Sequence, residues 1–132
     1  MNASKKSMLI VDDQHMVSEA LKIALEFDGY NVQTAASGLE ALTFFEPGKF
    51  DLVFTDFEMP EMNGHELASI IKARDARQPI IMVTAYADMV ADMTPVPQVD
   101  LVIGKPWSID ELRAAICKVL SSENPSAGLN AK

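Results

Sequence analysis

The chain has 132 residues and a mass of 14.4 kDa, the size of one domain that buries about two thirds of its unfolded surface. Hydrophobic residues make up 48% and charged residues 23%, a balance that predicts a packed core and excludes a disordered chain. The net charge of −8 opposes nucleic acid phosphates and anionic lipids, so we expect no direct nucleic acid binding and no membrane binding. Because no apolar run approaches the ~20 residues of a membrane span and none forms a signal-peptide core, we expect a cytoplasmic protein.

The first half of the chain alternates between strand and helix patterns. A compact apolar run predicts a buried strand at 8–11, and helical spacing of apolar residues predicts a helix at 17–25. Residues 31–35 alternate polar with apolar side chains, which is typical of an edge strand exposed on one side. A second helix is predicted at 39–45 and a second buried strand at 52–55.

The second half repeats this alternation. It predicts a helix at 67–71, a strand at 80–83, a short or distorted helix at 87–93, a strand at 101–103 and a last helix at 112–120. Four of the five strands are continuously apolar, which indicates a sheet that is buried on both faces.

Glycine, proline and capping residues define where several of these helices begin and end. Gly29 is a typical C-terminal cap of the first helix. Pro95 and Pro97 stop the fourth helix after about two turns. Ser108 with Glu111 forms a capping box that begins the last helix.

These patterns predict an α/β fold in the form of a three-layer sandwich. Strands that alternate with helices imply right-handed crossovers and a parallel sheet that is covered on both faces. With the alternating second strand at an edge, the expected strand order is 2-1-3-4-5, that of the flavodoxin-like fold. We expect this domain at residues 6–120, a flexible N-terminus at 1–5, and a disordered tail or linker start at 121–132.

Polar residues directly follow the buried strands, and they carry the functional signal: Asp12, Asp13, Asp56, Thr84 and Lys105. The carboxyl ends of parallel strands open into one crevice, so the three carboxylates meet between the first and third strands. Their mutual repulsion predicts a compensating cation. A sparse set of oxygen ligands without Cys or His favours Mg²⁺ over Ca²⁺.

A carboxylate at such a site can also attack phosphorus and form an aspartyl phosphate. Lys105 would then neutralise phosphoryl oxygens, and the Thr84 hydroxyl would donate a hydrogen bond to one of them. Each residue alone has an ordinary alternative: Asp12 and Asp13 could cap a helix, and Asp56 could form a turn. Their joint placement at one sheet edge favours the chemical interpretation.

The sequence resembles the receiver domain of bacterial two-component response regulators, in particular single-domain chemotaxis regulators, over residues 6–120. Four segments carry the resemblance, in order and at suitable spacing: Leu9-Ile10-Val11-Asp12-Asp13, Val53-Phe54-Thr55-Asp56-Phe57-Glu58-Met59-Pro60-Glu61-Met62-Asn63-Gly64, Val83-Thr84-Ala85-Tyr86 and Lys105-Pro106.

The resemblance implies a role for each polar residue of the site. Asp56 is similar to the phosphoacceptor of the family and is also a metal ligand. Asp13 resembles a direct Mg²⁺ ligand, Asp12 holds the ion mainly through water, and the backbone carbonyl of Glu58 completes the protein ligands. Mn²⁺ is an alternative ion. The resemblance also implies a cis peptide bond before Pro106.

The resemblance further implies a signalling function. A phosphohistidine on a sensor histidine kinase or histidine phosphotransfer protein donates the phosphoryl group, and the domain assists its own phosphorylation and dephosphorylation without being an enzyme for another substrate. Thr84, in the role of the family's switch hydroxyl, then moves towards the phosphate. This movement biases the surface of the fourth helix, fifth strand and last helix, which contacts a downstream protein or output domain.

Two positions bear on how far the family pattern applies. Val102 stands where receivers usually carry the Tyr or Phe that turns inward with the threonine. Tyr86 could replace that aromatic or could be a partly exposed loop tyrosine. Glu58 and Tyr86 flank the phosphoryl position, where a bulky aromatic should shield the aspartyl phosphate and give slow to moderate self-dephosphorylation.

Two other functions compete with the phosphorylated receiver. The first is a constitutive interaction scaffold in which phosphorylation is silent, which Val102 suggests. The second is a phosphohydrolase of the haloacid dehalogenase type, which normally has an acid/base Asp two residues after its nucleophile, whereas Glu58 stands there in this chain. Among the other reactive residues, we expect a buried or half-buried Cys117 and exposed His15 and His65.

Overall fold

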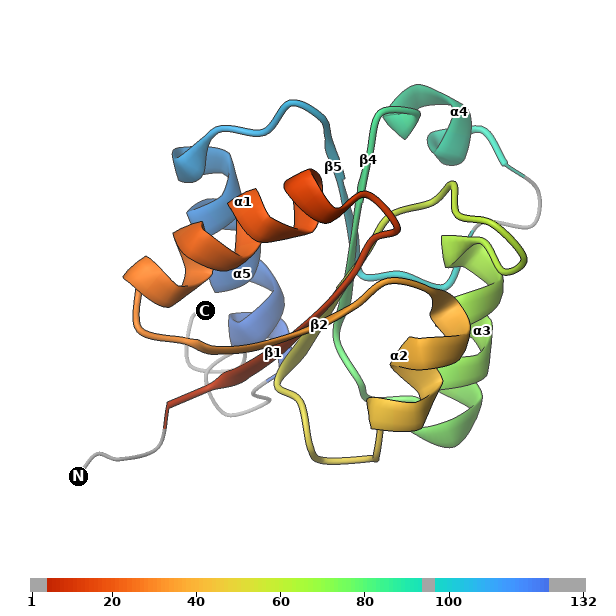
Figure 1. Cartoon of the computed structure of the whole chain (residues 1–132), viewed down its shortest axis with the longest axis horizontal. Coiled ribbons are helices and arrows are strands. Elements are labelled where there is room, and N and C mark those ends of the chain that lie inside the picture. The colour runs from red at the N-terminus through yellow and green to blue at the C-terminus, as the bar shows by residue number, and fades with distance from the viewer. Residues whose placement is uncertain (1–4, 94–96, 124–132) are drawn as a thin grey trace.

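The protein is an α/β fold in which strands and helices alternate along the chain (Figure 1). The computed structural model describes residues 5–93 and 97–123. Its elements are β1 (Ser7–Val11), α1 (His15–Phe27), β2 (Asn31–Ala35), α2 (Gly38–Phe44), β3 (Leu52–Thr55), α3 (Gly64–Arg74), β4 (Ile80–Thr84), α4 (Ala87–Ala91), β5 (Leu101–Gly104) and α5 (Ile109–Glu123).

The five strands form one parallel sheet of order β2-β1-β3-β4-β5, which confirms the predicted topology. β2 lies at one edge, as its alternating pattern predicted, and β5 lies at the other. α4 has five residues, which confirms the short fourth helix. Of the two prolines that predicted this shortening, Pro95 lies outside the described residues.

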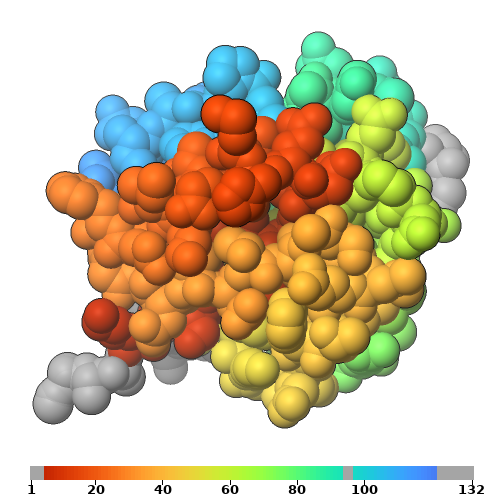
Figure 2. Space-filling view, viewed as in Figure 1, coloured from red at the N-terminus to blue at the C-terminus, as the bar shows by residue number. Residues whose placement is uncertain are grey.

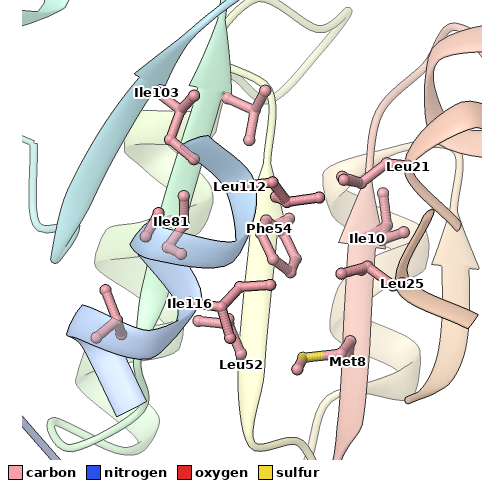
Figure 3. Close-up of a cluster of buried hydrophobic side chains, with 13 residues drawn as sticks. Met8, Ile10, Leu21, Leu25, Leu52, Phe54, Ile81, Ile103, Leu112 and Ile116 are labelled. Carbon is pink, nitrogen blue, oxygen red and sulfur yellow. The ribbon is translucent and has the colours of Figure 1, made fainter. Parts of the chain in front are cut away.

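Helices cover both faces of the sheet and give the three predicted layers (Figure 1). α1 and α5 pack on one face, where Leu21, Leu25, Leu112 and Ile116 share a core with β1 and β3. Figure 3 shows Phe54 of β3 among these side chains. α2 and α3 pack on the other face, and their buried residues are Gly38, Ala41, Gly64, Leu67, Ala68 and Ile71.

Local interactions fix several helix ends. Asn63 and Glu66 form a capping box at the start of α3, with hydrogen bonds of 2.8 and 3.0 Å. Ser108 and Glu111 confirm the predicted capping box of α5, with hydrogen bonds of 2.9 and 3.1 Å. Gly29 has a φ of 95°, which suits the predicted glycine cap after α1.

α5 extends to Glu123, so the first three residues of the predicted tail are helical. The helical backbone continues beyond Leu120, the last apolar residue of the predicted helix. The rest of the predicted tail, residues 124–132, and residues 1–4 of the predicted flexible N-terminus lie outside the described residues. No helix among the described residues is long and apolar enough to span a membrane.

The burial of three side chains differs from the prediction: Val102 and Cys117 are less buried than expected, and His65 is more buried. Val102 of β5 is only half-buried, because β5 is an edge strand and has a neighbour on one side only. Cys117 is exposed, contrary to expectation, because it lies on the outer side of α5. His15 is exposed as expected, whereas His65 is half-buried at the first turn of α3.

We predict that Phe54→Ala lowers the free energy of unfolding by about 3–5 kcal/mol, since Phe54 is 1% exposed at the centre of the core. Phe27→Ala is the matched control. Its side chain is 83% exposed, and the expected change is within about 0.5 kcal/mol. Urea denaturation of both variants measures the difference, and equal losses would contradict this description of the core.

Candidate functional site

Three carboxylates meet at the carboxyl edge of the sheet. Asp12 and Asp13 follow β1, and Asp56 follows β3, the strand next to β1. One carboxylate oxygen from each residue lies within 4.8 Å of the others. Asp12 and Asp56 are buried, and Asp13 is exposed. The site therefore has a buried floor and one solvent-facing ligand.

Backbone hydrogen bonds that extend the sheet hold the two buried aspartates in place. The Asp12 N–H donates to the carbonyl of Ala35 at 3.1 Å. The Asp56 N–H donates to the carbonyl of Val11 at 3.0 Å. Because these bonds continue the ladder beyond the last strand residue, the positions of both carboxylates follow from the strand register.

The first two aspartates do not cap α1, which was their ordinary alternative role. The N-cap residue is Gln14, and no side chain caps this helix end. Instead, Oδ1 of Asp12 accepts a hydrogen bond of 2.9 Å from the Gln14 N–H. That bond orients the Asp12 carboxylate and leaves its second oxygen facing the site.

Lys105 brings a positive charge between the two buried carboxylates. Its Nζ lies 3.1 Å from Oδ2 of Asp12 and 3.6 Å from Oδ2 of Asp56. The Lys105 side chain is half-buried, and the peptide bond to Pro106 is cis. One ammonium group therefore contacts two carboxylates from different strands.

The local environment raises the pKa of Asp56 above its usual value. Burial is the main cause, and the charge of Asp12 adds to it. The Lys105 ammonium and a hydrogen bond of 2.8 Å from the Phe57 N–H to Oδ1 act in the opposite direction. The Lys105 ammonium therefore does not fully offset the effect of burial on the Asp56 carboxylate.

The donor chemistry of this cluster fits a hard divalent cation such as Mg²⁺. The cluster offers only oxygen atoms, and three acidic groups face one ammonium. Glu58, whose carbonyl the resemblance assigns as a further ligand, is exposed two residues after Asp56. Asp12, Asp13 and Asp56 are the residues that could hold the ion.

Thr84 and Lys105 are connected across β4 and β5. Thr84 is fully buried at the end of β4, and its carbonyl accepts a hydrogen bond of 2.9 Å from the Lys105 N–H. The Thr84 hydroxyl oxygen accepts a hydrogen bond of 3.0 Å from the Tyr86 N–H. The Thr84 side chain is thus tied to the first residues of the segment that leads into α4.

Tyr86 and Glu58 face each other near the site. Tyr86 is 46% exposed, as its alternative role as a loop tyrosine suggested. The Glu58 carboxylate raises the pKa of the Tyr86 phenol above its usual range, through a side-chain hydrogen bond and its negative charge. The pair therefore links the segment after β3 to the segment after β4.

Gly64 has a role that the sequence interpretation missed. A Cβ at this position would lie 2.1 Å from the carbonyl oxygen of Asp56, so only glycine fits against this backbone. The Gly64 N–H also donates a hydrogen bond of 2.7 Å to the carbonyl of Phe57. The signal in the sequence is the glycine that directly follows the helix cap Asn63.

Known proteins share this arrangement of sequence and fold. The family described as response regulator receiver domain matches residues 8–117. The chain belongs to this family. As a receiver domain, it is a regulatory domain of two-component signalling.

Relatives and solved structures agree with this assignment. The chain is 37% identical to a "Probable transcriptional regulator ycf27" of Cyanophora paradoxa, covering 96% of this chain and 53% of the relative. It is 32% identical to "Response regulator MprA" of Mycobacterium sp. (strain KMS), covering 92% and 53%. The response regulator TrrA of Thermotoga maritima, solved in complex with Mg²⁺-BeF, has a TM-score of 0.79 at 37% identity, covering 86% of this chain and 98% of that chain. The chain spans about half the length of the curated relatives.

We predict that Asp56→Asn stabilises the metal-free domain at pH 7. The folded pKa of Asp56 lies above the ordinary value of 3.8, so folding disfavours the ionised carboxylate. The resulting loss in the free energy of unfolding is absent at pH values below the unfolded pKa of Asp56. It grows as the pH rises from the unfolded pKa through the folded pKa, and it is constant above that range. Thermal midpoints measured with a chelator from pH 3 to pH 7 should therefore favour the variant near neutrality only. A lower midpoint of the variant at pH 7 would mean that the ion pair with Lys105 outweighs burial.

Proposed function

We propose that Asp56 accepts a phosphoryl group from a phosphohistidine of a sensor histidine kinase or histidine phosphotransfer protein, in a reaction that requires Mg²⁺. The observation that carries this proposal is the gathering of three carboxylates within 4.8 Å, with the Lys105 ammonium beside two of them. Family membership supports the same chemistry.

The proposed reaction transfers the phosphoryl group between two side chains. A carboxylate oxygen of Asp56 forms a bond to phosphorus, the phosphorus–nitrogen bond of the donor histidine breaks, and the imidazole keeps the electron pair and takes a proton. The hydrogen bond from the Phe57 N–H to Oδ1 holds the carboxylate in one orientation for this attack. The domain supplies mainly position and charge.

Asp12, Asp13 and Asp56 would hold the Mg²⁺, with the Glu58 carbonyl as a further ligand, and Mn²⁺ fits the same oxygen donors. The ion supplies positive charge to the phosphoryl oxygens. Asp12 now forms the shorter of the two Lys105 contacts. Once Asp12 faces the cation, the Lys105 ammonium is free to contact a phosphoryl oxygen.

Thr84 is the proposed switch residue. Its hydroxyl oxygen accepts from the Tyr86 N–H, so its own proton is available as a donor to the phosphoryl group. Movement of Thr84 towards the phosphate would pull on the Tyr86 backbone and hence on α4. The signal would appear on the surface of α4, β5 and α5, where an unidentified target protein or output domain binds.

A constitutive scaffold is the second candidate function, because Val102 provides no aromatic side chain to turn inward. In that case the domain binds its partner with or without phosphorylation. We propose in both cases that residues 6–120 act as one cytoplasmic receiver unit, either alone or within a longer regulator. The net charge of −8 opposes nucleic acid phosphates and anionic lipids, so we propose no direct nucleic acid or membrane contact for this unit.

We predict that acetyl phosphate with Mg²⁺ adds one phosphoryl group to the chain, measured as intact mass. Asp56→Asn and removal of the metal by a chelator should each abolish the addition. Lys105→Ala should slow it strongly, because the ammonium that neutralises the phosphoryl oxygens is lost. Asp51→Asn is the matched control. Asp51 directly precedes β3, whereas Asp56 directly follows it, so the variant makes the same chemical change at the opposite end of the strand and should leave phosphorylation unchanged.

Two outcomes would contradict this proposal. Phosphorylation that persists in Asp56→Asn would place the acceptor elsewhere. No mass increase while Mg²⁺ still binds, measured by calorimetry, would favour the scaffold.

We predict that Tyr86→Ala shortens the lifetime of the aspartyl phosphate several-fold. The Tyr86 side chain interacts with Glu58 beside the acceptor, and its removal would admit water. Tyr86→Phe keeps the ring and should retain most of the shielding, which separates the ring from the hydroxyl. Loss of the phosphoryl group over time, followed by intact mass after removal of the donor, measures the lifetime. Equal lifetimes in all three proteins would assign no shielding to Tyr86.

A further inference from the structure

A broad groove lies at the amino edge of the sheet, opposite to the edge that carries the three carboxylates. It has a volume of about 880 Å³ and is lined by α5 and by the residues that directly precede four strands, namely Lys6, Tyr30, Asp51 and Pro79. Figure 2 shows α4 at the upper border of the molecule, as in Figure 1, and the segment between α2 and β3, which contributes to the groove, at the lower border. The groove is therefore a surface apart from the proposed phosphorylation site, and its volume is typical of small-molecule sites.

Hydrogen bonds fix the floor of this groove. The Ser7 N–H donates to Oδ2 of Asp51 at 2.7 Å, and the Asp51 N–H donates to the Ser7 carbonyl at 2.8 Å. Gln78 is 2% exposed, and its side-chain amide donates to the Pro79 carbonyl at 3.1 Å. The backbone carbonyl of Gln78 accepts a hydrogen bond of 2.7 Å from the Lys72 ammonium. The floor is thus formed before a ligand arrives, which lowers the entropy cost of binding.

Basic side chains outnumber acidic ones in the lining of the groove, although the whole chain has 19 acidic and 11 basic residues. The lining contains Lys6, Arg77 and Arg113 on the basic side and Asp51 and Asp75 on the acidic side. Both carboxylates already accept a backbone hydrogen bond, from the Ser7 N–H at 2.7 Å and from the Arg77 N–H at 3.1 Å respectively. These bonds offset part of their negative charge.

Two of the three cations are available to a ligand. Arg113 is held by Asp28 through two hydrogen bonds of 2.9 Å. Lys6 and Arg77 are exposed, and neither belongs to the ion pairs found within residues 5–93 and 97–123. An anion in the groove would therefore meet two positive charges that the fold does not use.

An apolar wall lines the same groove. Phe50 and Ile116 are buried there, and Tyr30 and Leu120 are half-buried. The pKa of the Tyr30 phenol is raised above its usual value, mainly by burial, so the phenol stays protonated at neutral pH and can donate a hydrogen bond. The groove thus combines apolar surface, a hydroxyl donor and positive charge.

We propose that this groove binds a small organic anion that has an apolar body and one acidic group, a carboxylate or a phosphate. Lys6 and Arg77 would contact the acidic group, and the apolar body would lie against the wall that includes Tyr30 and Leu120. The binding uses neither Asp56 nor Mg²⁺, because the groove lies at the other edge of the sheet.

The test follows the alkylation of Cys117, the only cysteine of the chain, which is exposed and lines the groove. Iodoacetamide adds one group to this thiol, and intact mass gives the rate. Naphthoate and naphthyl phosphate are the acidic probes, and naphthamide is the neutral probe with the same ring system. The reactions contain a chelator and no phosphodonor other than the probe, so they give the same answer whether or not Asp56 accepts phosphate.

A probe that occupies the groove protects the thiol. At about ten times its dissociation constant, an acidic probe should slow the alkylation about tenfold by mass action, and naphthamide should need an about tenfold higher concentration for the same effect. The acidic probe that protects at the lower concentration shows whether the groove prefers a carboxylate or a phosphate.

Paired variants separate the groove cations from the general charge of the chain. Lys6→Ala/Arg77→Ala should raise the protecting concentration of the acidic probes about tenfold and leave that of naphthamide unchanged, because it removes both available cations. Lys22→Ala/Lys118→Ala is the matched control. It removes the same charge, one of its residues is next to Cys117 in the sequence, and neither residue lines the groove, so the expected change is less than about twofold.

Three results would overturn the proposal. Equal protection by the acidic and neutral probes, or none by any of them at the limit of their solubility, would remove the preference for an anion. Equal losses in the two double variants would remove Lys6 and Arg77 from the interaction. Amide chemical shift changes that cluster at the carboxyl edge of the sheet, and not at the groove, would place the probe elsewhere. Circular dichroism checks that every variant is folded.

Discussion

The Lys105 ammonium between Asp12 and Asp56 is the interaction on which the functional edge of this domain depends. Three acidic groups gather there because β1 and β3 are adjacent and parallel, and a single lysine after β5 faces them. The arrangement places charged carboxylates at a buried position, and this burial raises the pKa of Asp56 although Lys105 acts in the opposite direction. A core built for stability alone would avoid that charge, and this supports the proposal that the site takes a cation and a phosphoryl group.

The fold and the positions of the buried site residues could be predicted from the sequence, because both depend on the periodic patterns that define the strands and helices. Apolar runs and helical spacing defined the alternation of strands and helices, and the polar alternation of residues 31–35 identified an edge strand. Once the sheet is parallel, the residues after its strands must meet at one edge. That single step placed Asp12, Asp56 and Lys105 together, which no motif spacing by itself could do.

The features that escaped prediction all depend on packing between elements. Gly64 is required by the carbonyl of Asp56, a contact between two segments that local propensity does not encode. The exposure of Val102 follows from the position of β5 at the edge of the sheet. On α1, apolar residues occupy two sides of the helix, and periodicity alone could not tell that Leu21 is buried whereas Ala20 is exposed.

Lys105 also couples the proposed cation site to the proposed phosphoryl site. Its ammonium contacts both Asp12 and Asp56. A cation bound by the carboxylates would release that ammonium towards a phosphoryl oxygen, so both ligands act on one side chain. By thermodynamic linkage, whatever factor the cation applies to the affinity for a phosphoryl ligand, the phosphoryl ligand applies to the affinity for the cation.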